Sequence, residues 1–199
     1  MIVYNRPMLT PSIENNSFYD LDFFGIKRSL PISYLSPRLK MANFTILGDI
    51  ELTEKAGEEL EKRLRDKDII PDCFVGPEVQ VVPLVHNLAM RFGHKRYVVL
   101  RKQVYGYMRQ PLIQQPWNGA PKHTNKLVLN GIDKTYLQGK RVVVVDDVVS
   151  TGSTMKMLLK LMKDIQVEVL IQCAIFKQGD RYTDTLLYLS ELPLLNAET

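Results

Sequence analysis

One segment in the second half of the chain limits the possible folds most strongly. Residues 142–145 are four consecutive valines, and residues 146 and 147 are both aspartate. A β-branched run of this kind predicts a strand that is buried on both faces, as in a parallel sheet. The chain then passes through a loop of serine, threonine and glycine, residues 150–154, into apolar residues at helical spacing. This order of strand, polar loop and helix predicts an α/β protein.

Strands and helices alternate in the same way on both sides of this segment. Apolar runs predict further strands at residues 73–75, 97–100, 167–176 and 186–189. Helical spacing predicts one helix that begins with Thr53 as its N-cap and a second helix that ends near Gly93. Such alternation produces right-handed βαβ units, so we expect a mainly parallel sheet of about five strands flanked by helices. Ligands of these sheets bind at the carboxyl ends of the strands.

Two stretches differ from this pattern. Residues 1–50 contain prolines at four positions and a cluster of aromatic residues, which predicts a loop-rich or short-stranded subdomain beside an α/β core of residues 51–199. Residues 103–139 are polar and aromatic, with several glycines and prolines. A loop of this length inside a compact domain is usually functional or mobile.

Composition and charge narrow the functional classes. The 26 basic and 22 acidic residues give a net charge of +4, and the basic residues are scattered, so binding to nucleic acid is not indicated. Cys73 and Cys173 lie in apolar runs and fit reduced core thiols, and the three histidines lack metal-ligand spacing. The sequence shows neither a run of about 18 apolar residues nor a signal peptide, so we expect a cytoplasmic protein without a membrane partner.

Residues 146–154 combine the chemistry of an anion site with that of a sugar or cation site. Small residues let backbone amides approach a phosphate closely, and the start of a helix adds positive charge. The carboxylates of Asp146 and Asp147 would repel a phosphate, so they fit ribose hydroxyls or a cation. A phosphorylated pentose satisfies all of these groups. The spacing and lysine of a P-loop are missing. The structural alternative is a buried strand that ends in solvated aspartates before a well-capped helix.

Residues 142–154 resemble the motif with which type I phosphoribosyltransferases bind 5-phosphoribosyl-1-diphosphate (PRPP), because the hydrophobic run, the acidic pair and the Thr-Gly-x-Thr loop all match. Over residues 20–190 the chain is similar to the adenine phosphoribosyltransferase branch. Residues 75–80 stand where that branch has its pyrophosphate loop, and residues 98–102 match its Arg-Lys strand end. The resemblance implies the type I phosphoribosyltransferase fold, with a mainly parallel five-stranded sheet and an N-terminal hood.

The resemblance also implies a role for each matching residue. Asp146 and Asp147 would hold the ribose hydroxyls, either directly or through Mg²⁺. The metal would contact these two residues only indirectly, through PRPP and water. The 5′-phosphate would be bound by Val149, Ser150, Thr151, Gly152, Ser153 and Thr154. The pyrophosphate would meet Arg101, Lys102 and a loop formed by Gly76, Pro77, Glu78, Val79 and Gln80. Residues 103–131 would be a mobile loop over the reaction. The hood would bind the base, with Phe23, Phe24 or Ile26 as stacking surfaces.

The activity that this resemblance implies is transfer of the phosphoribosyl group from PRPP to a purine base, adenine-like, in purine salvage. The products would be a nucleoside 5′-monophosphate and pyrophosphate, and relatives suggest a homodimer. Loss of pyrophosphate passes through an oxocarbenium-like state. The protein must then hold the leaving group with cations, exclude water and position the base, and it needs no nucleophile.

Two departures from the family pattern leave a second function open. Residues 78–81 read Glu-Val-Gln-Val where the adenine type reads Glu-Ala-Arg-Gly, and the second lysine after Arg101-Lys102 is absent. Cations of the long loop could substitute, namely Arg109, Lys122 or Lys126. The alternative is a non-catalytic regulator that senses PRPP, like the effector domains of purine repressors, although no winged-helix segment precedes residue 20.

Overall fold

The computed structural model describes residues 18–117 and 125–196. The chain divides into two compact units. Unit 1 comprises Met1–Phe44 together with Pro193–Thr199, and unit 2 comprises Thr45–Leu192. The sequence suggested a boundary near residue 50 and gave no sign that the last residues return to unit 1. Among the described helices, none has the length and apolar composition required to cross a membrane.

Unit 2 is built on a five-stranded sheet in the order β10-β9-β8-β4-β5, and every neighbouring pair is parallel. Its strands are β4 (Cys73–Pro77), β5 (Val98–Leu100), β8 (Arg141–Val149), β9 (Glu168–Gln178) and β10 (Leu187–Leu192). The central position of β8 follows from its composition, because all four valines are buried. This sheet confirms the predicted α/β fold class.

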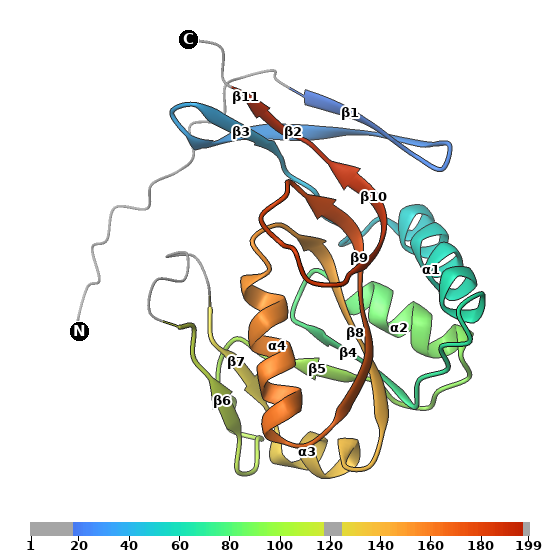
Figure 1. Ribbon diagram of the computed structural model, residues 1–199, viewed down its shortest axis with the longest axis vertical. Helices are drawn as coiled ribbons and strands as arrows, with labels where there is room; N and C mark the ends of the chain where they lie inside the picture. Colours follow the sequence, from blue (N-terminus) through green and yellow to red (C-terminus); the bar gives the residue numbers. More distant parts are fainter. Residues whose placement is uncertain (1–17, 118–124, 197–199) are drawn as a thin grey trace. The chain divides into compact units, whose positions relative to one another are not determined.

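The helices cover both faces of this sheet. They are α1 (Ile50–Arg65), α2 (Val82–Arg91), the short α3 (Gly131–Leu137) and α4 (Ser153–Asp164). The connection from β4 through α2 moves outward to β5, whereas the connection from β8 through α4 moves in the opposite direction to β9. Since such crossovers are right-handed, α2 and α4 are expected on opposite faces, and Figure 1 shows this arrangement. The topology therefore switches between β4 and β8, where the carboxyl ends of the strands leave room for a ligand.

The first helix begins earlier than the sequence predicted. The Asp49 side chain is the N-cap and accepts a hydrogen bond of 3.0 Å from the Leu52 amide. Thr53 instead lies within the first turn, where its hydroxyl donates to the Asp49 carbonyl oxygen at 2.6 Å. Aspartate and threonine are both favoured N-caps, so the local sequence offered two starting points.

Unit 1 is a four-stranded antiparallel sheet in the order β1-β2-β3-β11. Its strands are β1 (Phe18–Phe23), β2 (Ile26–Ser36), β3 (Leu39–Ala42) and β11 (Leu194–Asn196). Phe24 and Gly25 join β1 to β2 and both have positive φ, 51° and 86°, as a two-residue hairpin turn requires. This region is more regular than its prolines suggested.

The described part of residues 103–131 contains two short strands. β6 (Leu112–Gln114) and β7 (Leu127–Leu129) pair antiparallel. The backbone of Val128 also exchanges hydrogen bonds of 2.8 and 2.7 Å with Arg101, at the end of β5. The segment thus returns to the edge of the main sheet. That it moves over a ligand stays a prediction.

Candidate functional site

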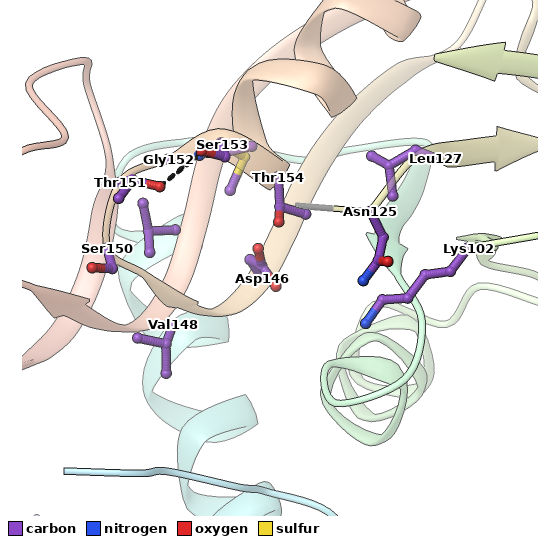
Figure 2. Close-up of a pocket in the computed structure, with 12 residues that line it drawn as sticks. Lys102, Asn125, Leu127, Asp146, Val148, Ser150, Thr151, Gly152, Ser153 and Thr154 are labelled. Atoms are coloured by element: carbon purple, nitrogen blue, oxygen red, sulfur yellow. Dashed lines mark hydrogen bonds between the residues drawn. The ribbon is translucent and has the colours of Figure 1, made fainter. Parts of the chain in front are cut away.

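A pocket of about 250 Å³ opens at the carboxyl end of β8, within unit 2 (Figure 2). Its lining consists of Lys102, Asn125, Leu127, Asp146, Val148, Val149, Ser150, Thr151, Gly152, Ser153, Thr154 and Met155. The structure therefore brings together all six residues predicted for the 5′-phosphate, with Asp146 and Lys102 beside them. We call residues 149–154 the phosphate loop.

The phosphate loop presents backbone amides and hydroxyls at the start of α4. Gly152 is the N-cap of α4, with φ of +71°, and as a glycine it has no side chain to occupy the helix end. The hydroxyl groups of Thr151 and Ser153 lie 2.8 Å apart, a hydrogen bond that Figure 2 shows as a dashed line. The first amides of a helix lack acceptors within the helix and carry partial positive charge, so this loop can bind an anion.

The two aspartates occupy different positions. Asp146 is 7% exposed and lines the pocket, whereas Asp147 is not among the lining residues. This difference follows from the strand itself, since successive side chains of a strand point to opposite faces. The Asp147 amide donates a hydrogen bond of 3.0 Å to Asp146 Oδ1.

Burial also changes the acidity of this pair. It raises the pKa of Asp146 well above its usual value, and the charge of Asp147 raises it further, while Lys102 acts in the opposite direction. Burial raises the pKa of Asp147 as well. An ionised pair in this position is stabilised by a nearby cation or by hydrogen-bond donors.

Lys102 and Asn125 form the side of the pocket opposite the phosphate loop. In Figure 2 the amino end of Lys102 and the side-chain amide of Asn125 extend toward the space beside Asp146. Sequence reasoning identified Lys102 from its place after a buried strand. It missed Asn125, which belongs to no motif, and the apolar lining residues Leu127, Val148 and Met155.

The residues predicted for the pyrophosphate loop, 76–80, form the last two positions of β4, the strand next to β8, and the turn after it. None of them lines the pocket. A Cβ atom on Gly76 would lie 2.9 Å from the Val145 carbonyl oxygen, so glycine permits the close approach of the two strands. The peptide bond between Glu78 and Val79 is cis. The Gln80 side chain is held by the Thr45 hydroxyl, which donates to its Oε1 at 2.7 Å.

Glu78 ties this loop to the end of β5. Its carboxylate accepts a hydrogen bond of 2.5 Å from the Lys102 amide and lies 2.5 Å from Arg101 Nε. The Arg101 guanidinium also stacks over the Tyr105 ring, 4.6 Å from its centroid. Of the two predicted cations, Lys102 therefore reaches the pocket, whereas Arg101 is paired within the protein.

The remaining predicted residues belong to unit 1, are absent from the lining of this pocket, or lie outside the described part. In unit 1, Phe23 is 1% exposed and packs edge-on against Phe24, with ring centroids 4.9 Å apart. Phe24 is 44% exposed and Ile26 is half-buried, so Phe23 offers less open surface than the other two. Three further cations were predicted as substitutes. Arg109 and Lys126 are absent from the pocket lining, and Lys122 lies outside the described residues.

The donor set fits a divalent metal only in part. Within residues 18–117 and 125–196, no cluster of three or more histidine, cysteine or acidic side chains could enclose a metal ion. Asp146 and Asp147 provide carboxylate oxygens, which Mg²⁺ prefers, but too few for its octahedral shell. These residues fit a Mg²⁺ ion that takes most of its ligands from water and from a phosphorylated compound.

The sheet topology and the pocket define a doubly wound α/β protein whose phosphate loop lines a pocket at the topological switch point. Residues 44–192 match the phosphoribosyl transferase domain family, and the chain belongs to this family. The predicted family and fold are thereby confirmed.

Two hypoxanthine/guanine phosphoribosyltransferases are similar to part of this chain. A hypoxanthine/guanine phosphoribosyltransferase of Methanothermobacter thermautotrophicus is 30% identical over 134 residues, which are 67% of this chain and 64% of that protein. The protein of the same name from Ferroglobus placidus is 34% identical over 118 residues, which are 59% of this chain and 58% of that protein. The matched regions thus span less than two thirds of these relatives.

Two solved structures share the fold. The adenine phosphoribosyltransferase of Thermoanaerobacter pseudethanolicus superposes with a TM-score of 0.59 at 22% identity, over 87% of this chain and 95% of the other. The enzyme of the same name from Saccharomyces cerevisiae gives 0.61 at 16% identity, over 86% and 93%.

Proposed function

We propose that this chain is a phosphoribosyltransferase that transfers the phosphoribosyl group of PRPP to a purine base, releasing pyrophosphate and a nucleoside 5′-monophosphate. The observation that carries this proposal is one pocket that is lined together by the phosphate loop, Asp146 and Lys102. These groups offer an anion site, an acceptor for ribose hydroxyls and a cation within one cavity. Family membership supports the same reaction.

In this proposal each part of the pocket binds one part of PRPP. The amides and hydroxyls of the phosphate loop hold the 5′-phosphate, and Asp146 accepts hydrogen bonds from the ribose hydroxyls. Lys102 lies on the opposite side of the pocket, where it stabilises the negative charge that grows on the departing pyrophosphate. Asp147 adds negative charge behind Asp146 and thereby strengthens the site for a cation.

Catalysis then depends on orientation and charge. The C1–O bond to pyrophosphate breaks as the base nitrogen approaches the opposite face of the anomeric carbon, so both must be held in line. Mg²⁺ bound to the pyrophosphate would neutralise part of the leaving-group charge. The described residues around the pocket exclude water from one side, and residues 103–131 are proposed to close the other.

The comparisons support a purine as acceptor. The curated relatives carry the name hypoxanthine/guanine phosphoribosyltransferase, whereas several solved structures with this fold are adenine enzymes. The adenine-like acceptor inferred from sequence segments is therefore not confirmed. The proposal covers the purine class, and the assay below distinguishes its members.

A second candidate is a PRPP-binding regulator without transferase activity. It is favoured by the pairing of Glu78 with Arg101 and by the neutral Gln80 in the pyrophosphate loop. Both features reduce the positive charge available to pyrophosphate while leaving the phosphate loop intact.

The deciding experiment supplies the protein with PRPP, Mg²⁺ and, separately, adenine, guanine, hypoxanthine, xanthine and orotate, and records pyrophosphate release. Release with a purine is expected, with a loss of at least about 100-fold in the Asp146→Asn variant. Asp164→Asn is the matched control, because Asp164 pairs with Lys160 at the far end of α4.

Each other outcome has a distinct meaning. Absence of release together with PRPP binding by calorimetry would establish the regulator. Absence of both would refute the phosphoribosyl site. The predicted homodimer and cytoplasmic location stay predictions, the former to be measured by light scattering.

A further inference from the structure

An aromatic ring from a distant part of the chain packs directly on the phosphate loop. Tyr182 lies between β9 and β10 and is 1% exposed. A Cβ atom built on Gly152 would lie 1.9 Å from Tyr182 Cδ2 and 2.3 Å from its Cε2. The ring therefore fills the space that any other side chain at residue 152 would need.

The ring is held in place by the sheet. Its hydroxyl donates a hydrogen bond to Oε1 of Gln172, a residue of β9 that stands in register with Val144 of β8. Burial raises the pKa of Tyr182 to about 12, so the hydroxyl stays protonated and remains a donor at neutral pH. Lys156 Nζ lies over the ring, 5.8 Å from its centroid. Lys156 is also the residue whose amide donates to the Gly152 carbonyl oxygen, at 2.8 Å.

These contacts restrict the backbone that binds the anion. Gly152 has a left-handed conformation, which a loop of small residues could leave at little cost if nothing packed against it. With the ring in place, the backbone at residue 152 cannot withdraw from the pocket. An anion site whose donors are already oriented loses less entropy on binding than one that must become ordered.

We infer that Tyr182 is a positioning residue for the 5′-phosphate site, acting through Gly152 to hold the amides of the phosphate loop toward the pocket. This role rests on the proposed function of the loop. Tyr182 does not line the pocket, so it acts without touching the ligand. Neither its surroundings in the sequence nor the family motif pointed to it.

A purely structural role makes a different prediction. Tyr182 is also part of the hydrophobic core of unit 2, and loss of a core ring lowers stability wherever it lies. A positioning role requires in addition that phosphate binding weakens selectively, while binding of a ligand held elsewhere in the site is unchanged.

The chain offers a matched control in Tyr188. This residue of β10 is half-buried, lies under Lys177 with Nζ 5.8 Å from its ring centroid, and donates from its hydroxyl to Glu191 at 2.9 Å. Like Tyr182 it has a hydroxyl hydrogen bond and a lysine over its ring, but these two partners, Glu191 and Lys177, lie outside the phosphate loop.

The test measures dissociation constants by calorimetry for ribose 5-phosphate and, separately, for pyrophosphate with Mg²⁺. Tyr182→Leu is expected to weaken the binding of ribose 5-phosphate at least tenfold and to leave the binding of pyrophosphate unchanged. Tyr188→Leu is expected to change neither. Thermal unfolding of each variant shows that it is folded at the temperature of the titration.

The outcomes separate this inference from the proposed function. Wild-type protein that does not bind ribose 5-phosphate would refute the phosphate site, and the role of Tyr182 with it. Wild-type binding with an unchanged constant in Tyr182→Leu, or an equal loss for both ligands, would overturn the positioning role alone.

A milder variant covers the case in which Tyr182→Leu does not fold. Tyr182→Phe keeps the ring and removes the hydroxyl that donates to Gln172. It is expected to weaken the binding of ribose 5-phosphate two- to fivefold and to leave the binding of pyrophosphate unchanged. Wild-type constants for both ligands in this variant would then contradict the role.

Discussion

The segments at the carboxyl ends of β8 and β4 come from neighbouring strands but differ in where their polar groups are directed. Every residue of the phosphate loop lines the pocket, and its donors are backbone amides and small hydroxyls. In residues 76–80, by contrast, Glu78 is paired with Arg101 and Gln80 with Thr45. The first segment lines the pocket, whereas the second pairs the side chains of Glu78 and Gln80 within the protein.

This difference indicates how the two halves of PRPP would be recognised. The 5′-phosphate half would be bound by a site that exists before the ligand arrives. The pyrophosphate half would depend on Lys102, on Mg²⁺ that accompanies the ligand, and on breaking the pair between Glu78 and Arg101. Because an ion pair and a hydrogen bond must be exchanged there, binding at this end should be weaker and more sensitive to salt.

The largest effect is expected from Gly152→Ala. The added methyl group meets the Tyr182 ring, and the backbone has a φ that alanine disfavours. We expect a loss of about 2–4 kcal/mol in the free energy of unfolding and at least about 100-fold weaker binding of ribose 5-phosphate. Denaturant unfolding and calorimetry measure the two quantities.

Gly139→Ala is the control for this prediction. Gly139 has the same φ of +71°, but nothing lies within 4 Å of the position of its Cβ atom. Only the backbone strain remains, so we expect the free energy of unfolding to fall by about 1 kcal/mol. Ligand binding should not change. An equal fall in the free energy of unfolding of the two variants would show that the contact with the Tyr182 ring does not add to the cost of Gly152→Ala.

Asp146→Asn should have the next largest effect, with opposite signs for binding and stability. Affinity for PRPP is expected to fall about 10- to 100-fold, since the ribose and the metal lose a charged acceptor. Asp147→Asn is expected to weaken PRPP binding less, because Asp147 does not line the pocket.

The stability effect follows from the raised pKa of Asp146. In the unfolded chain the carboxyl ionises near its usual value, about 3.9. The folded state therefore loses stability as the pH rises from there through the raised pKa. Asp146→Asn removes this loss, so its Tm should exceed that of the wild type at pH 8 and approach it near pH 4. A variant with a lower Tm at pH 8 would contradict this account.

The smallest effect is expected from adding a positive charge to the predicted pyrophosphate loop, residues 76–80. Gln80→Arg replaces a neutral side chain in the pyrophosphate loop, and we expect pyrophosphate to bind about 5- to 10-fold more tightly, which is about 1 kcal/mol. Ribose 5-phosphate binding should not change. Gln138→Arg adds the same charge at an exposed site after α3, and it controls for net charge. If both variants tighten pyrophosphate binding equally, the charge of the loop itself has no special role.

The sequence predicted the features that depend on neighbouring residues. The valine run identified β8, and the small residues after it identified the phosphate loop, because both signals lie within a few positions. The alternation of a strand also implies that Asp146 and Asp147 face different sides, although only the structure shows which one lines the pocket.

Contacts between residues that are distant in the sequence could not be predicted from such local patterns. The pairing of Arg101 with Glu78, the entry of Asn125 into the pocket and the packing of Tyr182 on Gly152 each connect separate segments. No periodicity or motif encodes these contacts, because they depend on how the strands and their connections are arranged.

The position of β11 has a consequence for how the chain is made. This strand completes the sheet of unit 1 by pairing with β3, yet all of unit 2 lies between them in the sequence. During synthesis β1, β2 and β3 leave the ribosome before unit 2, and the edge of β3 that β11 occupies is then without this partner. Unit 2 has all of its strands before β11 emerges. We therefore expect unit 2 to fold first on the ribosome, and unit 1 to gain its fourth strand as a late step.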